Sequence, residues 1–221
     1  MKILMHPEYD IWTKSPIMDK WRMTEAARLC YKSERKNPED DSRLLKDCFR
    51  RGHGSVLEHS SLTVKFICDR AVANELVRHR LAGYSQESTR YCNYSKDKFD
   101  GQITVIKPAM IRENSMEYYI WEKHCKMAEK SYFDLLDLGA TPETARAVLP
   151  LSLKTEIVVT ANLREWYHIL DLRTAKDTHP DMRLTMHGLL LDLGDEFPEI
   201  FRELALTRNA EIVDFFSKER N

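Results

Sequence analysis

The chain has 221 residues, of which 43% are hydrophobic and 31% are charged, and its formal net charge at pH 7 is −1. These values are ordinary for a globular protein, and the length suits one well-buried domain over residues 1–221. A nearly neutral chain lacks the positive excess of proteins that act on nucleic acid or anionic membranes, so we expect neither partner.

The sequence also predicts a cytoplasmic protein. No apolar run approaches the roughly 20 residues that span a bilayer, and the apolar start of the chain is too short for a signal peptide. The cysteines are odd in number and form no Cys-x-x-Cys pair, which favours reduced thiols over disulfides or zinc. They are Cys30, Cys48, Cys68, Cys92 and Cys125.

Two strands and two helices are predicted in the first third of the chain. Residues 2–6 alternate weakly and predict a short strand, and residues 17–31 predict a helix. A charged loop follows, and Pro38 with its acidic neighbours begins a second helix that Gly52 ends. Residues 61–69 alternate apolar and polar side chains, which predicts a strand.

Residues 70–80 are predicted to form a helix, since no glycine or proline occurs before Gly83. Arg78, His79 and Arg80 lie near its end, where side chains about 100° apart fan over roughly 200° of the surface. Side chains spread this widely cannot all contact one small anion, so they suit a position between two ligands. The alternative is a solvated helix end, where cations favour the macrodipole.

Beyond Gly83 the chain is predicted to be a polar loop. Its side chains include Ser85, Gln86, Ser88 and Arg90. Hydroxyl groups, backbone N–H groups and a guanidinium are the donors that bind a phosphate and a planar heterocycle. The loop is therefore a candidate nucleotide site.

The second half predicts two more strands and several helices. Strands are predicted at residues 103–106 and 154–160, and helices at 113–138, 162–173 and twice within 178–206, with a loose or surface helix at 211–221. The long helix at 113–138 either packs subunits together or belongs to the core. Asn162 is a good N-cap, which alone can explain its presence.

Thr141-Pro142 predicts the start of a short helix that carries Arg146 among apolar residues. Arg146 either binds a ligand or forms a buried structural pair.

Three or four strands among six or more helices predict an α+β fold, with a small, mostly antiparallel sheet flanked by several helices. The order is not a βαβ series, and Gly-x-Gly-x-x-Gly is absent, which excludes a Rossmann dinucleotide site. His53, Glu58 and His59 do not have the His-Glu-x-x-His spacing, so no metal site is predicted.

The pattern Arg78-His79-Arg80, seven residues, Ser88 and Arg90-Tyr91 resembles the signature of the flavin-dependent thymidylate synthases. The segments Gln86–Tyr91, His53–His59 and Ala145–Pro150 extend the resemblance. It implies conversion of dUMP to dTMP, with 5,10-methylenetetrahydrofolate as carbon donor and tightly bound FAD, recharged by NADPH, as hydride donor. It also implies a homotetramer with active sites shared between subunits.

The resemblance assigns two overlapping sets of residues. Those that contact dUMP would be Glu75, Leu76, Val77, Arg78, Gln86, Glu87, Ser88, Thr89, Arg90, Arg146 and Arg173. Those that contact FAD would be His53, Ser55, Arg78, His79, Arg80, Gln86, Asn162, Leu163, Arg164 and His168. Two would be catalytic: Arg173, held over the uracil ring, and Ser88, which aligns and polarises the pyrimidine. No base positioned to make Ser88 a nucleophile is evident.

Two positions depart from the family pattern. Glu75 stands where many members carry Gln, and Ser85 stands where others have Asn. A non-catalytic nucleotide or nucleic-acid binder built on the Arg-rich helix is the rival hypothesis. A different flavin enzyme is a third.

Overall fold

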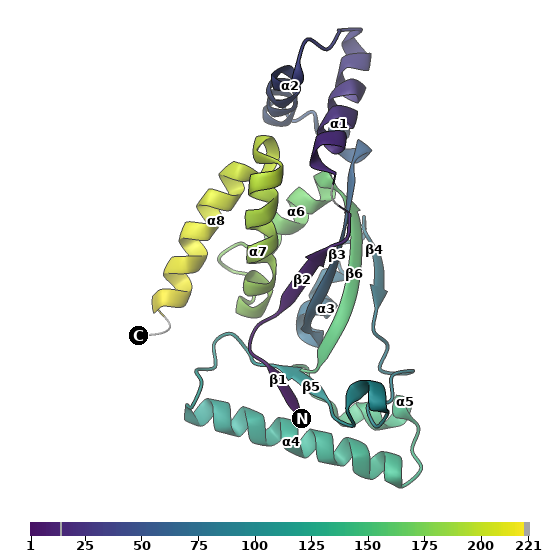
Figure 1. The fold of residues 1–221 in the computed structure, drawn as a ribbon. Coiled ribbons are helices and arrows are strands. Elements are labelled where there is room, and N and C mark those ends of the chain that lie inside the picture. The colour runs from purple at the N-terminus through teal and green to yellow at the C-terminus, as the bar shows by residue number, and fades with distance from the viewer. Residues whose placement is uncertain (14, 219–221) are drawn as a thin grey trace.

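The computed structural model describes residues 1–13 and 15–218. A four-stranded antiparallel sheet in the order β2-β3-β6-β4 lies at the centre, and a parallel pair, β1 with β5, lies below it (Figure 1). The strands are β1 (Lys2–Leu4), β2 (Glu8–Ile11), β3 (Ser61–Asp69), β4 (Gly83–Gln86), β5 (Thr104–Ile106) and β6 (Lys154–Asn162). The predicted α+β class with a small antiparallel sheet is confirmed.

The helices surround this sheet. α6, α7 and α8 cover one side, α1 and α2 extend the upper end, and α4 runs across the lower end (Figure 1). Their bounds are α1 (Pro16–Tyr31), α2 (Pro38–Arg50), α3 (Arg70–Leu76), α4 (Met116–Asp137), α5 (Pro142–Ala145), α6 (Leu163–Arg173), α7 (Pro180–Glu196) and α8 (Pro198–Lys218). Short 3₁₀ helices are η1 (Gly54–His59), η2 (Asp97–Phe99) and η3 (Arg146–Val148). No described helix has the length and apolarity to cross a membrane.

β3 and β6 form the centre of the sheet. They pair along their whole length, from Ser61 opposite Asn162 to Asp69 opposite Lys154. Their alternating side chains are buried under α6, whose Trp166 donates from its indole N–H to the Leu62 carbonyl at 2.9 Å. A smaller core lies between α4 and β5, around Val105 and Tyr132. The two cores hold the sheet and the lower layer in place.

The helix predicted at 70–80 is shorter than expected. α3 ends at Leu76, and the N–H groups of Arg78 and His79 bond to carbonyls three residues back, which tightens the chain into a turn. The Tyr84 hydroxyl donates to the carbonyls of Leu76 and His79 at 2.8 and 2.6 Å. The Arg78–Arg80 run therefore lies on a turn, and the argument from helical spread does not apply to it.

The polar segment after that turn was wrongly predicted as a loop throughout. Gly83–Gln86 forms β4, an edge strand that pairs antiparallel with β6, with Gly83 opposite Thr160. An edge strand that is exposed to solvent can be formed without alternating apolar side chains. The composition of β4 therefore resembles that of a loop. β2 was missed for a similar reason, since it pairs only with β3.

Two further segments differ from their predictions. Residues 53–59, whose polar composition predicts a loop before the strand at 61–69, contain η1. The segment at 211–221 continues α8 as far as Lys218, with Ile212 only 2% exposed, while residues 219–221 lie outside the described residues.

The N-cap role of Asn162 is confirmed, because its side-chain oxygen accepts from the Glu165 N–H at 2.9 Å. Asn162→Ala is expected to lower the free energy of unfolding by about 0.5–2 kcal/mol, since it leaves an α6 N–H unsatisfied. Urea unfolding measures this loss. Asn162→Asp keeps an acceptor and is the control; an equal loss in both variants would show that the cap is not the cause.

Candidate functional site

Arg173, the last residue of α6, joins α6 to the end of α3. Its Nε donates to His79 Nε2 at 2.8 Å, its Nη1 to Glu75 Oε2 at 2.9 Å, and its Nη2 to the Glu75 carbonyl at 3.0 Å. A guanidinium has five N–H groups, so two remain for a ligand. The predicted catalytic arginine is thus fixed in orientation before any ligand binds.

His79 is held as a neutral imidazole in one tautomer. Its Nε2 accepts from Arg173, so Nδ1 carries the hydrogen and faces Glu165 Oε1 at 3.8 Å. Burial lowers the pKa of His79 to about 4, and the charges of Arg173 and His168 act in the same direction. The imidazole therefore remains an acceptor for Arg173 near neutral pH.

This arrangement predicts a loss of stability in acid. His79 titrates near 6.5 when unfolded and about 4 when folded, so between these values the unfolded chain binds the extra proton. The contribution is present above pH 6.5 and is lost as the pH falls toward 4, by about 2 kcal/mol between pH 7 and pH 5. Urea unfolding at both pH values measures it.

The control for this prediction is His79→Gln, whose amide does not titrate. The variant is expected to show a smaller difference in unfolding free energy between the two pH values. An equal difference in both proteins would mean that other groups cause the acid sensitivity.

His79, Glu165 and His168 also offer ligand atoms that all lie within 4.8 Å of one another. A metal ion there would have to take the His79 nitrogen from Arg173 or lie close to its positive charge. We assign this group to the support of Arg173 and not to a metal.

A second group of predicted residues follows β4. Arg146 Nη1 donates to the buried Thr89 hydroxyl at 3.2 Å, and Arg90 Nε pairs with Glu143 Oε1 at 3.1 Å. The Ser88 hydroxyl accepts from the Arg90 N–H at 3.3 Å. Arg146 is exposed, so the alternative of a buried structural pair is wrong. Hydroxyls and guanidinium groups are brought together here as an anion site requires.

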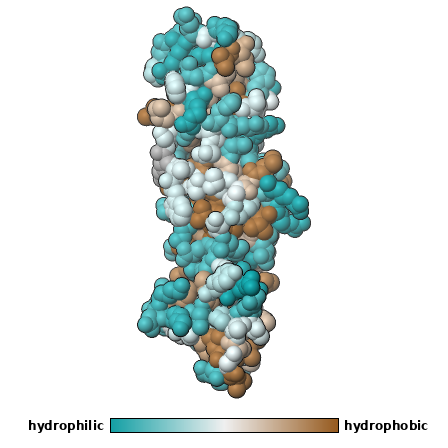
Figure 2. All heavy atoms as spheres, turned by 90° about the vertical axis from the view of Figure 1, so that its right-hand side faces the viewer, coloured by the Kyte–Doolittle hydropathy of each residue, from teal (hydrophilic) through white to brown (hydrophobic). Residues whose placement is uncertain are grey.

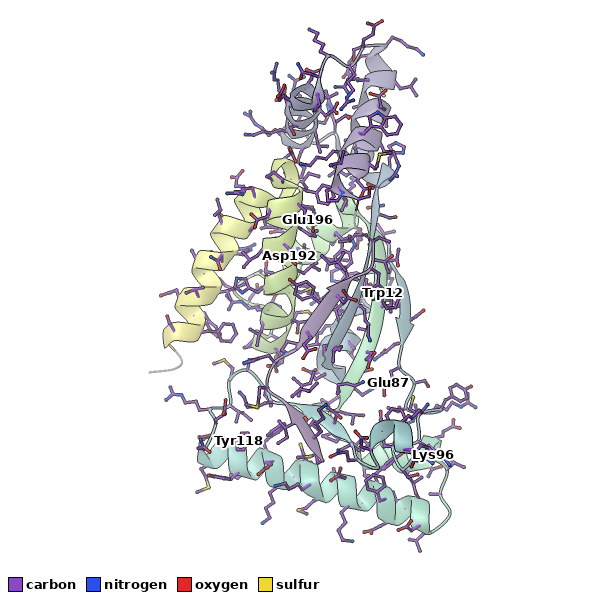
Figure 3. The ribbon with its side chains drawn as sticks, viewed as in Figure 1. Trp12, Glu87, Lys96, Tyr118, Asp192 and Glu196 are labelled. Carbon is purple, nitrogen blue, oxygen red and sulfur yellow. The ribbon has the colours of Figure 1, made fainter. Side chains whose placement is uncertain are left out.

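Two residues of this segment turn their side chains inward. Glu87 accepts from Lys154 at 3.0 Å and from the Tyr94 hydroxyl at 3.1 Å, at the lower end of the sheet (Figure 3). Gln86 Nε2 donates to the Thr155 hydroxyl at 3.3 Å. In this arrangement Glu87 anchors the loop and leaves only its backbone to face a ligand.

The predicted flavin contacts form an exposed rim around η1 and the start of α6. His53, Ser55 and His168 are exposed, and Arg164 pairs with Glu58 at 2.6 Å. A Cβ on Gly54 would lie 3.0 Å from Arg164 Nε, so the glycine lets that guanidinium lie against the backbone. Such a donor-rich surface fits a large anionic cofactor.

Other predicted contacts differ in what they can offer. Leu76 and Leu163 are buried, so only their backbone groups can reach a ligand, whereas Val77 is exposed. Arg78 and Arg80 are exposed, and within residues 1–13 and 15–218 their side chains have neither a hydrogen bond nor an ion pair. Both cations are therefore available to a bound anion.

The structure does not bring all of these residues together. No hydrogen bond or ion pair of the described part joins the Ser88–Arg146 group to the Arg173 group. The loop leaves β6 at Glu156 and the rim begins at Asn162, so roughly 20 Å of strand separates the loop from the rim, while Arg173 lies at the opposite end of α6 from the rim. Two cavities, of about 360 and 930 Å³, are lined by none of Ser88, Arg146 and Arg173. The Ser88–Arg146 group and the Arg173 group, called half-sites below, are thus not joined by any contact among the described residues.

The pairing of Arg173 with Glu75 and His79 was not predicted from the sequence, and neither was the contact of Glu165 with His79. Glu165 is not among the predicted contacts, yet Glu165, Ile169 and Arg173 are spaced four apart and so share one helix face. That spacing was the available signal. Tyr84, which holds the turn, gave none, because its contacts depend on β4.

Comparison with known proteins shows which family this sequence resembles. A family model described as thymidylate synthase complementing protein matches residues 17–199. A flavin-dependent thymidylate synthase of Geobacter sulfurreducens is 34% identical over 186 residues, covering 80% of this chain and 78% of that protein. One from Thermococcus kodakarensis is 34% identical over 201 residues (86% and 80%), and one from Thermococcus onnurineus is 35% identical over 151 residues (68% and 61%).

Proposed function

Because the chain belongs to the family of flavin-dependent thymidylate synthases, we propose that it converts dUMP to dTMP. The carbon comes from 5,10-methylenetetrahydrofolate, and the hydride comes from FAD that NADPH reduces. The observation that carries the proposal is Arg173, a guanidinium fixed by three acceptors with two N–H groups left for a planar ligand.

In this proposal Arg173 donates to the uracil ring and stabilises the negative charge that develops there during the reaction. Arg90, Arg146 and the Ser88 and Thr89 hydroxyls bind the phosphate and sugar, with Ser88 aligning the pyrimidine. Binding of this kind orders the reactants, which is the main contribution a protein makes when a cofactor carries the chemistry.

The exposed rim suits the flavin. Arg78, Arg80 and Arg164 supply cations, and His53, Ser55 and His168 supply further polar contacts. The bound flavin would supply the hydride. The chain's contribution is to hold the ring system against the pyrimidine and to keep water from the space between them.

The two half-sites support an active site assembled from different subunits, and we propose the homotetramer of the family. α4 exposes Met116, Tyr119, Ile120 and Met127 at helical spacing, so one apolar stripe is not covered by any of the described residues. Hydrophobic atoms also gather midway along the face that carries β4 (Figure 2). One face of α4 thus packs in the smaller core, as the core alternative predicted, and we propose that the exposed face packs against another subunit.

An absorption spectrum tests the proposal. The purified protein, loaded with FAD, is expected to show the visible flavin bands, which NADPH bleaches, and to form dTMP when dUMP and methylenetetrahydrofolate are added. Omitting each reactant in turn is the control. Protein that takes up no FAD, or that reduces FAD but forms no dTMP, would overturn the proposal.

A further inference from the structure

Glu75 holds Arg173 with two different acceptors. The Glu75 carboxylate accepts a hydrogen bond from Arg173 Nη1 at 2.9 Å, and the Glu75 backbone carbonyl accepts one from Nη2 at 3.0 Å. The side chains are 29% and 19% exposed, so the pair lies at the edge of the core and faces the site. A charge-assisted contact made by two groups of one residue fixes the plane of the guanidinium as well as its position.

We infer that Glu75 is a positioning residue for the proposed reaction and acts through Arg173 instead of contacting the nucleotide itself. The inference rests on the proposed function. The carboxylate keeps the guanidinium in the plane in which its two remaining N–H groups meet the pyrimidine. It also offsets part of the positive charge that attracts the nucleotide.

Among the residues around Arg173, Glu75 has the largest influence on the orientation and charge of the guanidinium. His79 accepts from Arg173 as a neutral imidazole. Glu165 lies 3.8 Å from the other ring nitrogen of His79, so neither residue brings a negative charge into contact with the guanidinium. Among the described residues, Glu75 has the only carboxylate paired with Arg173. Gln in its place would keep an acceptor oxygen and lose the charge. The substitution therefore separates the orientation of the guanidinium from the neutralisation of its charge.

Two substitutions in FAD-loaded protein test the inference. Glu75→Ala is expected to lower kcat about ten- to a hundred-fold, because the guanidinium is no longer held in plane. Glu75→Gln is expected to restore kcat to within about three-fold of wild type, while dUMP binds several-fold more tightly because a negative charge is gone. Calorimetric titration with dUMP gives the affinity separately from turnover.

The Arg173→Ala background shows whether Glu75 acts through Arg173. There, Glu75→Ala is expected to cause no further loss of kcat. A direct contact with the nucleotide would instead weaken dUMP binding in both backgrounds and would overturn the inference. Glu122→Gln, which breaks a 2.8 Å ion pair with Lys126 on α4, is the control for loss of a carboxylate elsewhere.

A ligand-free measurement separates this inference from the proposed function. Thermal unfolding of the two single variants and the double variant is expected to be non-additive, with the double variant no less stable than Arg173→Ala. Additive losses would show that the two residues do not hold each other. Wild-type protein that forms no dTMP would overturn the proposed function, and the unfolding cycle would still decide whether Glu75 holds Arg173.

Discussion

Arg173→Ala is expected to lower kcat by about 10²- to 10³-fold while the protein still binds FAD, since one preorganised donor to developing charge is worth that much. The guanidinium is fixed in the free protein by His79 and Glu75, so little reorganisation is needed when charge develops on the pyrimidine. Single-turnover formation of dTMP, with the flavin spectrum recorded in the same sample, measures both properties.

Arg173→Lys is the control for that loss. Lysine keeps the charge but has no planar fork, so it cannot bond to His79, Glu75 and a ligand at once. We expect it to recover only part of the activity. Wild-type turnover in Arg173→Ala would remove Arg173 from the mechanism.

The elements that sequence predicted well are those whose signals are local. β3 has the predicted bounds because its apolar alternation is uninterrupted, and α6 begins after Asn162 because that side chain caps it. α4 and α7 follow their helical stripes in the same way. In each case, the side chains of the segment itself are enough to predict its conformation.

The errors occurred where a distant segment decides the structure. α3 ends early because the Tyr84 hydroxyl satisfies carbonyls in the turn, and Tyr84 is positioned by the pairing of β4 with β6. β4 itself is a strand only because β6 offers a free edge. The residues within each segment therefore do not predict the early end of α3 or the strand conformation of β4.

The same division applies to the site. The resemblance places Ser88, Arg90 and Arg146 among the dUMP contacts, and in the structure Arg146 bonds to Thr89, between Ser88 and Arg90. It did not reveal that Glu87 turns inward, or that Glu75 pairs with Arg173, 98 residues away in the chain. Contacts between side chains of distant elements depend on how the sheet positions α3 against α6.

Mixing two inactive variants is expected to restore activity if the half-sites of different subunits combine. Arg173→Ala damages one half-site and Arg146→Ala the other, and no described contact joins them within the chain. With random exchange of subunits, about a quarter of the sites would contain two intact halves, so activity would rise to about a quarter of wild type. Differently tagged variants, co-purified to verify exchange, provide the sample.

A pair of variants in the same half-site is the control for this experiment. Arg90 and Arg146 both lie in the Ser88–Arg146 group, so mixing Arg90→Ala with Arg146→Ala leaves every site with one damaged half. No recovery is expected there. If the Arg173→Ala and Arg146→Ala pair also failed to recover after verified exchange, both halves of each site would have to come from one chain.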